Sequence, residues 1–148
     1  MVITNNKQAH FNYHIISDYK CGIELLGWEV KSIRQKQVQI NTSHAILKKG
    51  EVWLIGSIIH PMLMASSHVN TDPTRSRKLL LKKSEIRKLI GQVERKGCTL
   101  VPIKLFWEKN LVKLQIGLAQ GKKEHDKRRT IKERDLNKEQ RRFFKKTI

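Results

Sequence analysis

The chain has 148 residues, two cysteines and a formal net charge of +18, because 31 Lys and Arg side chains exceed 13 Asp and Glu. That length predicts one domain with short extensions. Cys21 and Cys98 lie far apart, which excludes a zinc site of the usual paired spacing, and we expect reduced thiols in a cytoplasmic protein. No apolar run reaches the roughly 18 residues of a membrane span, so we expect no membrane partner. The charge excess instead favours a polyanionic partner.

The positive charge is concentrated in two segments. Residues 75–96 contain nine basic and two acidic side chains, and residues 119–148 contain twelve and five. A solvated basic surface is the simpler interpretation of such runs. Two separate runs on one small chain nevertheless favour two contacts with nucleic acid.

The first half of the chain shows mostly strand patterns. Residues 1–10 are polar, and we expect a flexible N-terminus there. Apolar residues alternate between positions 11 and 26, as in a long bent strand or a pair of strands. Residues 27–34 have the spacing of a short helix with Val30 and Ile33 on one side.

Two further strands are expected at 43–47 and 52–58, joined by a Lys49-Gly50 hairpin turn. Residues 61–73 contain turn-forming residues and predict a long loop. Loops of about 12 or more residues without structure are unusual and are often functional.

The second half begins with the clearest helix pattern. We expect Ser84 to cap this helix and Gly97 to follow its last turn. Its apolar side has the i, i+3, i+4, i+7 spacing and consists of Ile86, Leu89, Ile90 and Val93. Strands are then expected at 99–107 and 112–118, with a turn at Glu108-Lys109-Asn110.

These elements predict a mainly β fold, an OB-like closed β-barrel of about six strands with two or three helices, over residues 11–120. Apolar content collapses after Ala119. Residues 121–148 therefore cannot bury enough apolar area to order themselves, and we expect a basic tail that is disordered when free and helical when bound.

Common catalytic motifs are absent: the sequence has no G-x-S-x-G, GxxxxGK[ST], HExxH or GxGxxG. Asp126 beside Lys127 could suggest a nuclease, but metal-dependent nucleases need several converging carboxylates. We therefore expect no enzyme activity, no metal and no cofactor.

Basic side chains at two places are candidates for phosphate contacts. Arg75, Arg77 and Lys78 follow the Asp72-Pro73 turn, where we expect them to be exposed, and Lys122-Lys123 follows the last strand. Trp28 and Trp107 could stack on bases, although their size favours the core or barrel rim.

Three segments together resemble the SmpB family, the protein partner of transfer-messenger RNA. They are residues 22–34 (GIELLGWEVKSIR), 72–81 (DPTRSRKLLL) and 117–128 (GLAQGKKEHDKR), and the resemblance covers nearly the whole chain. It implies an OB-type barrel that binds the tRNA-like domain of transfer-messenger RNA. It also implies a tail that enters the empty mRNA channel of stalled bacterial ribosomes, beside the decoding centre of the small-subunit ribosomal RNA.

The resemblance also assigns site residues. Those expected to face the tRNA-like domain are Asn6, Tyr13, Glu29, Lys31, Arg34, Leu80, Lys82 and Lys113. Those expected at the decoding centre are His125, Asp126, Lys127 and Arg128, with Ile131 and Lys132 opening the tail helix.

Three positions depart from the family pattern. Relatives often have an acidic residue at position 20, which is Lys here, Tyr at position 125, which is His here, and Asn or His at position 82, which is Lys here. An aromatic ring is kept at 125, and Lys82 would add a phosphate contact.

We expect a monomeric adaptor for trans-translation whose partners are transfer-messenger RNA and the ribosome. Two alternatives share its charge: a ribosomal protein or general RNA chaperone with a structural role, and an RNA-processing enzyme.

Overall fold

The computed structural model describes residues 1–62, 71–121, 128–129 and 131–136. The elements in chain order are β1 (Val2–Asn5), α1 (Ala9–Asn12), β2 (Tyr13–Ile23), α2 (Gly27–Arg34), β3 (Val38–Gln39), β4 (His44–Lys48), β5 (Glu51–Ile55), β6 (Ile58–Ile59), β7 (Arg77–Leu80), α3 (Lys83–Lys96), β8 (Thr99–Glu108) and β9 (Leu111–Gly121). Residues 131–136 are also helical.

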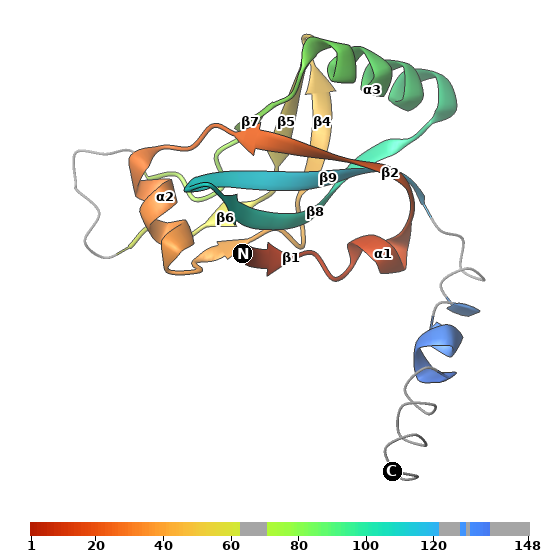
Figure 1. Ribbon diagram of the computed structural model, residues 1–148, viewed down its shortest axis with the longest axis horizontal. Helices are drawn as coiled ribbons and strands as arrows, with labels where there is room; N and C mark the ends of the chain where they lie inside the picture. Colours follow the sequence, from red (N-terminus) through yellow and green to blue (C-terminus); the bar gives the residue numbers. More distant parts are fainter. Residues whose placement is uncertain (63–70, 122–127, 130, 137–148) are drawn as a thin grey trace.

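Six antiparallel strands close into a barrel in the order β8-β4-β5-β7-β2-β9, and β9 pairs back with β8 (Figure 1). β1 joins the free part of β8, while β3 and β6 form a separate pair. The predicted closed β-barrel of about six strands is confirmed. Closure pairs the edges of these six strands with one another, which limits the strand edges on which other chains could assemble.

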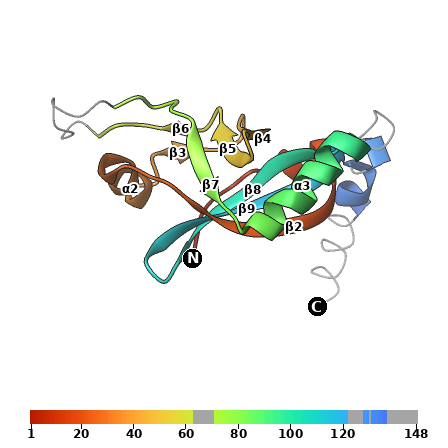
Figure 2. The same cartoon turned by 90° about the horizontal axis from the view of Figure 1, so that it is seen from above.

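Alternation along the strands fills the barrel with aliphatic side chains. Val52 and Leu54 on β5 are fully buried, as are Leu114 and Ile116 on β9. The same core includes Ile33 of α2 and the predicted apolar side of α3, where Ile86 and Leu89 are buried and Ile90 and Val93 partly so. Both helices are therefore anchored to the barrel, and they lie near opposite ends of the molecule (Figures 1 and 2).

The two predicted hairpin turns are confirmed. Lys49 and Gly50 have φ of 52° and 73°, and Lys109 and Asn110 have φ of 49° and 66°. Positive φ at both central residues matches the right-handed twist of the flanking strands.

The N-terminus differs from its prediction, since Val2–Asn5 is a strand paired with β8 and not a flexible segment. The Trp107 N–H also donates to the Met1 carbonyl at 2.8 Å, and the Asn6 N–H to the Ile103 carbonyl at 2.7 Å. These polar residues are ordered by backbone hydrogen bonds to a strand about 100 positions away, which local composition does not reveal.

Three other boundaries differ. Residues 77–80 form β7, a strand that the sequence pattern did not predict because it begins within a run of basic residues. The predicted strand at 52–58 divides into β5 and β6 around Gly56, whose φ is +78°. Helix α3 begins before Ser84, because the Glu85 carboxylate accepts from the Lys82 N–H at 3.1 Å and moves the cap to Lys82. Most of the predicted 61–73 loop, residues 63–70, lies outside the described residues.

Candidate RNA-binding surface

Residues singled out in α2, in β7 and just before β7 meet in a buried ionic cluster. Arg75 Nη2 lies 2.6 Å from Glu29 Oε1, and Arg77 Nη2 lies 2.7 Å from Glu29 Oε2. The side chains of Glu29 and Arg77 are fully buried, and that of Arg75 is mostly buried. One carboxylate thus holds two guanidinium groups more than 45 positions away in sequence, that of Arg77 on β7 and that of Arg75 just before this strand.

The cluster ties several backbone segments together. Arg77 Nη1 donates to Ser57 Oγ at 2.9 Å, and its Nη2 donates to the Pro73 carbonyl at 3.2 Å. Arg75 donates to the Glu24 carbonyl at 3.3 Å, and the Leu26 N–H donates to Glu29 Oε1 at 2.7 Å. Nearly every polar atom is satisfied, as a buried charge requires.

The electrostatics agree with an intact ion pair. Burial raises the pKa of the Glu29 carboxyl, but hydrogen bonds from Arg75, the Leu26 N–H and Arg77 outweigh it and hold that pKa below its usual value. Burial lowers the pKa of Arg77, and the Glu29 carboxylate opposes this shift. A guanidinium remains protonated at physiological pH, so both groups are charged.

This geometry corrects one expectation. Arg77 was predicted to be exposed, and that prediction is wrong because its side chain has no accessible surface. Glu29 likewise presents no atom to a partner. Asn6 is also buried, with its Nδ2 donating to the Pro102 carbonyl at 2.9 Å.

Other predicted contacts are accessible and adjacent. Gly22 on β2 pairs with Leu80 on β7 on one side and with Lys113 on β9 on the other. Leu80 is 48% exposed although it belongs to a strand. Lys82, exposed at the start of α3, follows two residues later. These residues form one patch, which we call the Gly22 patch: Gly22, Leu80, Lys82 and Lys113.

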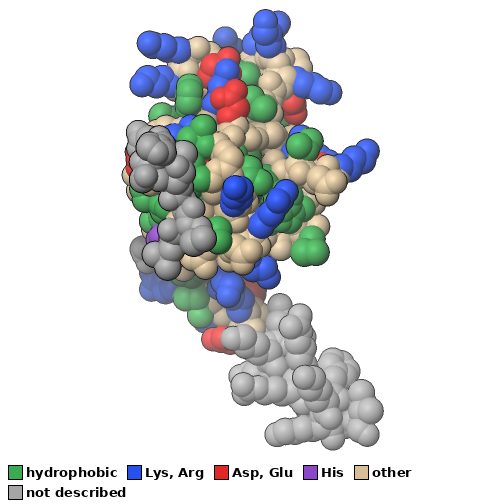
Figure 3. Space-filling model, turned by 90° about the vertical axis from the view of Figure 1, so that its left-hand side faces the viewer, with side chains coloured by type: hydrophobic (Ala, Val, Ile, Leu, Met, Phe, Trp, Pro, Cys, Tyr) green, Lys and Arg blue, Asp and Glu red, His purple; other side chains and the backbone are tan. Residues whose placement is uncertain are grey.

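A second group lies at the α2 end of the molecule. Lys31 and Arg34 are exposed, and the Arg34 guanidinium lies 5.9 Å from the centroid of the Trp107 ring. Figure 3 views this end, where Lys and Arg side chains project from the surface. Trp107 is partly buried at the barrel rim and Trp28 is buried, as their size favours.

Two further lysines are held by acids. Lys78 lies 3.7 Å from Glu51, and Lys20 lies 2.7 Å from Glu108. The hydrogen bond from Lys20 lowers the pKa of the Glu108 carboxyl. Lys20 on β2 therefore has an acidic partner within this chain, at the end of β8.

Tyr13 lies apart from the Gly22 patch, at the opposite end of β2, where it pairs with Gly121. Tyr13 and Gly22 are nine positions apart along the strand, or roughly 30 Å at about 3.3 Å per residue. Tyr13 and Asn6 share a surface pocket with Asn12, Thr42 and His44. Tyr13 and the Gly22 patch thus lie toward opposite ends of one long strand.

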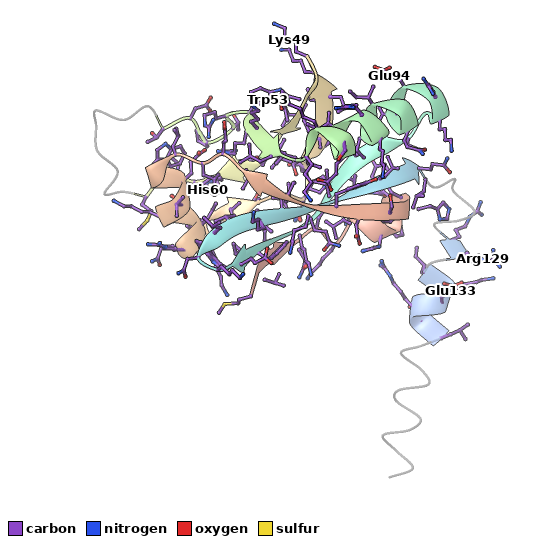
Figure 4. The ribbon with its side chains drawn as sticks, turned by 45° about the horizontal axis from the view of Figure 1, so that its top comes forward. Lys49, Trp53, His60, Glu94, Arg129 and Glu133 are labelled. Atoms are coloured by element: carbon purple, nitrogen blue, oxygen red, sulfur yellow. The ribbon has the colours of Figure 1, made fainter. Side chains whose placement is uncertain are left out.

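Five of the candidate tail residues lie outside the described residues: Lys122, Lys123, His125, Asp126 and Lys127. Arg128, Ile131 and Lys132 are described and exposed, and Ile131 and Lys132 open a helical stretch. The Arg134 guanidinium lies 5.7 Å from the Phe11 ring centroid, so this stretch lies beside α1. Figure 4 labels Glu133 on this stretch and Arg129, which precedes it in the chain.

One surface feature went unrecognised in the sequence. Trp53 is half-buried on the outer side of β5, in a hollow with Ile46, Ile55 and Lys48 (Figure 4). Alternation along 52–58 left both sides apolar, so the pattern alone did not show which side faced outward. Among the described residues there is no group of three or more His, Cys, Asp or Glu that could hold a metal, and no helix is long and apolar enough to cross a membrane.

Comparison with known proteins agrees with the barrel and its motifs. The family model described as "SmpB protein" matches residues 3–146. The chain belongs to the SmpB family. A relative named SsrA-binding protein from Leptothrix cholodnii is 50% identical over all of this chain and 96% of its own length. Another SsrA-binding protein, from Cupriavidus necator, is 52% identical over 98% of this chain and 97% of its own length.

The SmpB fold is also found among solved structures. One chain, from work described as "tmRNA-SmpB: a journey to the center of the bacterial ribosome", matches with a TM-score of 0.65 and 43% identity. The match covers 82% of this chain and 85% of that one. The OB-like barrel described above is therefore shared with an experimentally solved SmpB.

Proposed function

We propose that this chain is an RNA-binding adaptor for trans-translation, which binds the tRNA-like domain of transfer-messenger RNA and delivers it to stalled bacterial ribosomes in the cytoplasm. The observation that carries the proposal is similarity along the full chain to SsrA-binding proteins, together with the fold of an SmpB described with tmRNA on the bacterial ribosome. This similarity favours the adaptor over a structural ribosomal protein and over an RNA-processing enzyme.

On the barrel, we assign the RNA contacts to accessible residues. Leu80, Lys82 and Lys113 of the Gly22 patch offer one apolar side chain beside two amines, which suits a ribose or base edge flanked by phosphates. Lys31 and Arg34 extend this surface at α2 and Tyr13 at the far end of β2. Arg75 and Lys78, each bonded to an acid, would serve RNA only at the edge of this surface.

The buried candidates are assigned a positioning role. Glu29 and Arg77 fix α2 against β7, and Asn6 fixes the turn after β1 against β8. These residues would shape the RNA surface through the backbone segments that they join, without touching RNA. Glu29 and Arg77 occur inside the family-like motifs at 22–34 and 72–81, which fits such a positioning role.

The tail is assigned to the ribosome. Basic residues dominate positions 121–148, and Arg128, Ile131 and Lys132 are exposed on the part that is described. By its likeness to the family, the segment that contains Lys122, Lys123 and His125–Arg128 would enter the vacant mRNA channel near the decoding centre. Lys and Arg there would bind phosphates, and the His125 ring would stack on a base.

Truncating the chain after Gly121 tests the division between barrel and tail. The cut preserves β9, because Gly121 still pairs with Tyr13. We expect the truncated protein to bind a tRNA-like domain transcript with nearly unchanged affinity and to support no peptide tagging on stalled ribosomes. Affinity is measured by filter binding and tagging in a reconstituted translation reaction, with the full chain as control. Loss of transcript binding would contradict this division.

A further inference from the structure

A basic groove lies between α3 and β2, outside the contacts assigned above. Its volume is about 420 Å³, within the roughly 300–1,000 Å³ typical of ligand sites. One wall consists of Ile16, Ser17 and Tyr19 on β2, and Leu118 of β9 contributes to the lining. The α3 wall carries four cations: Arg87, Lys88, Arg95 and Lys96.

None of these four cations is neutralised within the part of the chain that the structure describes. The ion pairs there join Lys20, Arg75, Arg77 and Lys78 to acids, and none involves the α3 cations. Glu94, the acid near the end of α3, instead lines a pocket against β4 (Figure 4). The groove therefore has an uncompensated positive field, which attracts a polyanion.

A glycine lies in the middle of this helical wall. Gly91 belongs to α3, where glycine is less favourable than Ala by about 0.8–1.0 kcal/mol. A Cβ built there would meet nothing within 4 Å, so no packing within the protein requires the glycine. Glycine does let another molecule approach a backbone closely. Its place between the cation pairs suggests that the groove receives a ligand against the helix backbone.

The groove is close to the Gly22 patch along the chain. Lys82 is the residue before α3, and Arg87 begins the groove little more than one turn later. Residues 87 and 96 are nine positions apart, or about 13.5 Å at 1.5 Å per residue. That length spans more than one phosphate of a nucleic-acid strand.

We propose that the α3–β2 groove binds the phosphate backbone of the same tRNA-like domain that meets the Gly22 patch. Arg87, Lys88, Arg95 and Lys96 hold successive phosphates, and Gly91 leaves room for the strand. This inference rests on the proposed function, because it extends the surface assigned to that RNA.

The test is a Lys88→Gln/Lys96→Gln double variant of the full chain, titrated with a tRNA-like domain transcript at several salt concentrations. Loss of two phosphate contacts should lower the magnitude of the log affinity against log salt slope by roughly 1.4–1.8. The matched control is Lys48→Gln/Lys49→Gln, which removes two exposed lysines at the β4–β5 hairpin and gives the same net charge. Its slope should stay near that of the parent.

Each contrary result has a distinct meaning. Equal slope changes in both double variants would overturn phosphate binding in the groove, since the change in net charge alone would explain them. If Lys88→Gln/Lys96→Gln weakened binding to vacant ribosomes but not to the transcript, the assignment of the groove to the tRNA-like domain would be overturned. Failure of the parent chain itself to bind the transcript would overturn the proposed function, and the groove with it.

A second variant separates binding from folding. Gly91→Gln introduces a good helix former whose side chain projects into the groove, so the thermal midpoint should rise. Transcript affinity should fall on the order of tenfold, as when one charge-assisted contact is displaced. A higher midpoint with unchanged affinity would overturn the close approach at Gly91.

Discussion

A single carboxylate, that of Glu29, has a large structural influence in this protein. It is fully buried, and it accepts hydrogen bonds from Arg75, Arg77 and the Leu26 N–H. A buried ion pair contributes little net stability compared with apolar residues, but removing one partner leaves an uncompensated charge. The cluster therefore makes the position of α2 sensitive to one side chain.

Glu29→Gln should lower the free energy of unfolding by about 3–5 kcal/mol at pH 7, because Arg77 would stay charged and buried with only an amide as partner. Urea unfolding measures the change. The control is Glu108→Gln, which removes an exposed carboxylate paired with Lys20 and should leave the midpoint nearly unchanged. Similar midpoints for the two variants would contradict the role of burial.

The same pair predicts a dependence on pH. The pKa of Glu29 is lower in the folded chain than its usual value, so the folded chain binds this proton less tightly than the unfolded chain does. Its stabilisation is complete above the unfolded pKa of about 4.3 and is lost as the pH falls through the folded pKa. The stability difference between the parent and Glu29→Gln should therefore shrink in acid, measured by urea midpoints from pH 7 to 3. A constant difference would argue against an ion pair.

Among the secondary-structure elements, two glycines illustrate opposite constraints. Gly56, between β5 and β6, has φ of +78°, and a Cβ there would lie 2.9 Å from the Thr42 carbonyl oxygen. Gly91 lies inside α3 with open space around it. The backbone conformation thus requires glycine at position 56, whereas Ala would stabilise the helix more than glycine does at position 91.

The same substitution should therefore act in opposite directions. Gly56→Ala should destabilise the fold by at least about 1–2 kcal/mol, the cost of left-handed backbone for a residue with a Cβ. Gly91→Ala should stabilise it by up to about 1 kcal/mol. Thermal unfolding of the two variants beside the parent checks both signs, and stabilisation by Gly56→Ala would show that the β5–β6 turn is misassigned.

Local pattern sufficed for some elements and not for others. Helix α2, the apolar side of α3 and the two hairpin turns follow from spacing and turn residues within a few positions. Strands β1 and β7 do not, because each has only four residues, two of them polar or basic, and their order comes from pairing with distant strands: β1 with β8, and β7 with β5 and β2. Such strands cannot be recognised from their own residues and are identified only through the strands with which they pair.

The whole molecule combines a small closed barrel with a large positive charge. Its +18 net charge disfavours compactness, and the barrel offsets this with one continuous apolar core. Several basic groups are paired with acids, while no ion pair among the described residues involves those at the Gly22 patch or along α3. The positive electrostatic field is therefore concentrated at the Gly22 patch and along α3.

Binding of the tRNA-like domain should accordingly be steeply salt-dependent. Six to ten phosphate contacts correspond to a loss of roughly 10³–10⁵ in affinity between 50 and 200 mM salt. A titration of the full chain across that range provides the measurement. A nearly flat response would contradict the electrostatic contribution assigned to the Gly22 patch and α3.

By itself, the sequence determined the mainly β barrel, the principal helices, the SmpB resemblance and the two basic segments, since each depends on residue type and short spacing. Only the tertiary structure decided which charges are available to RNA. It buried Arg77 against Glu29, paired Lys20 with Glu108 and left the cations of α3 open beside β2. The reason is that an ion pair between residues 48 positions apart depends on how α2 and β7 pack, which no local pattern encodes.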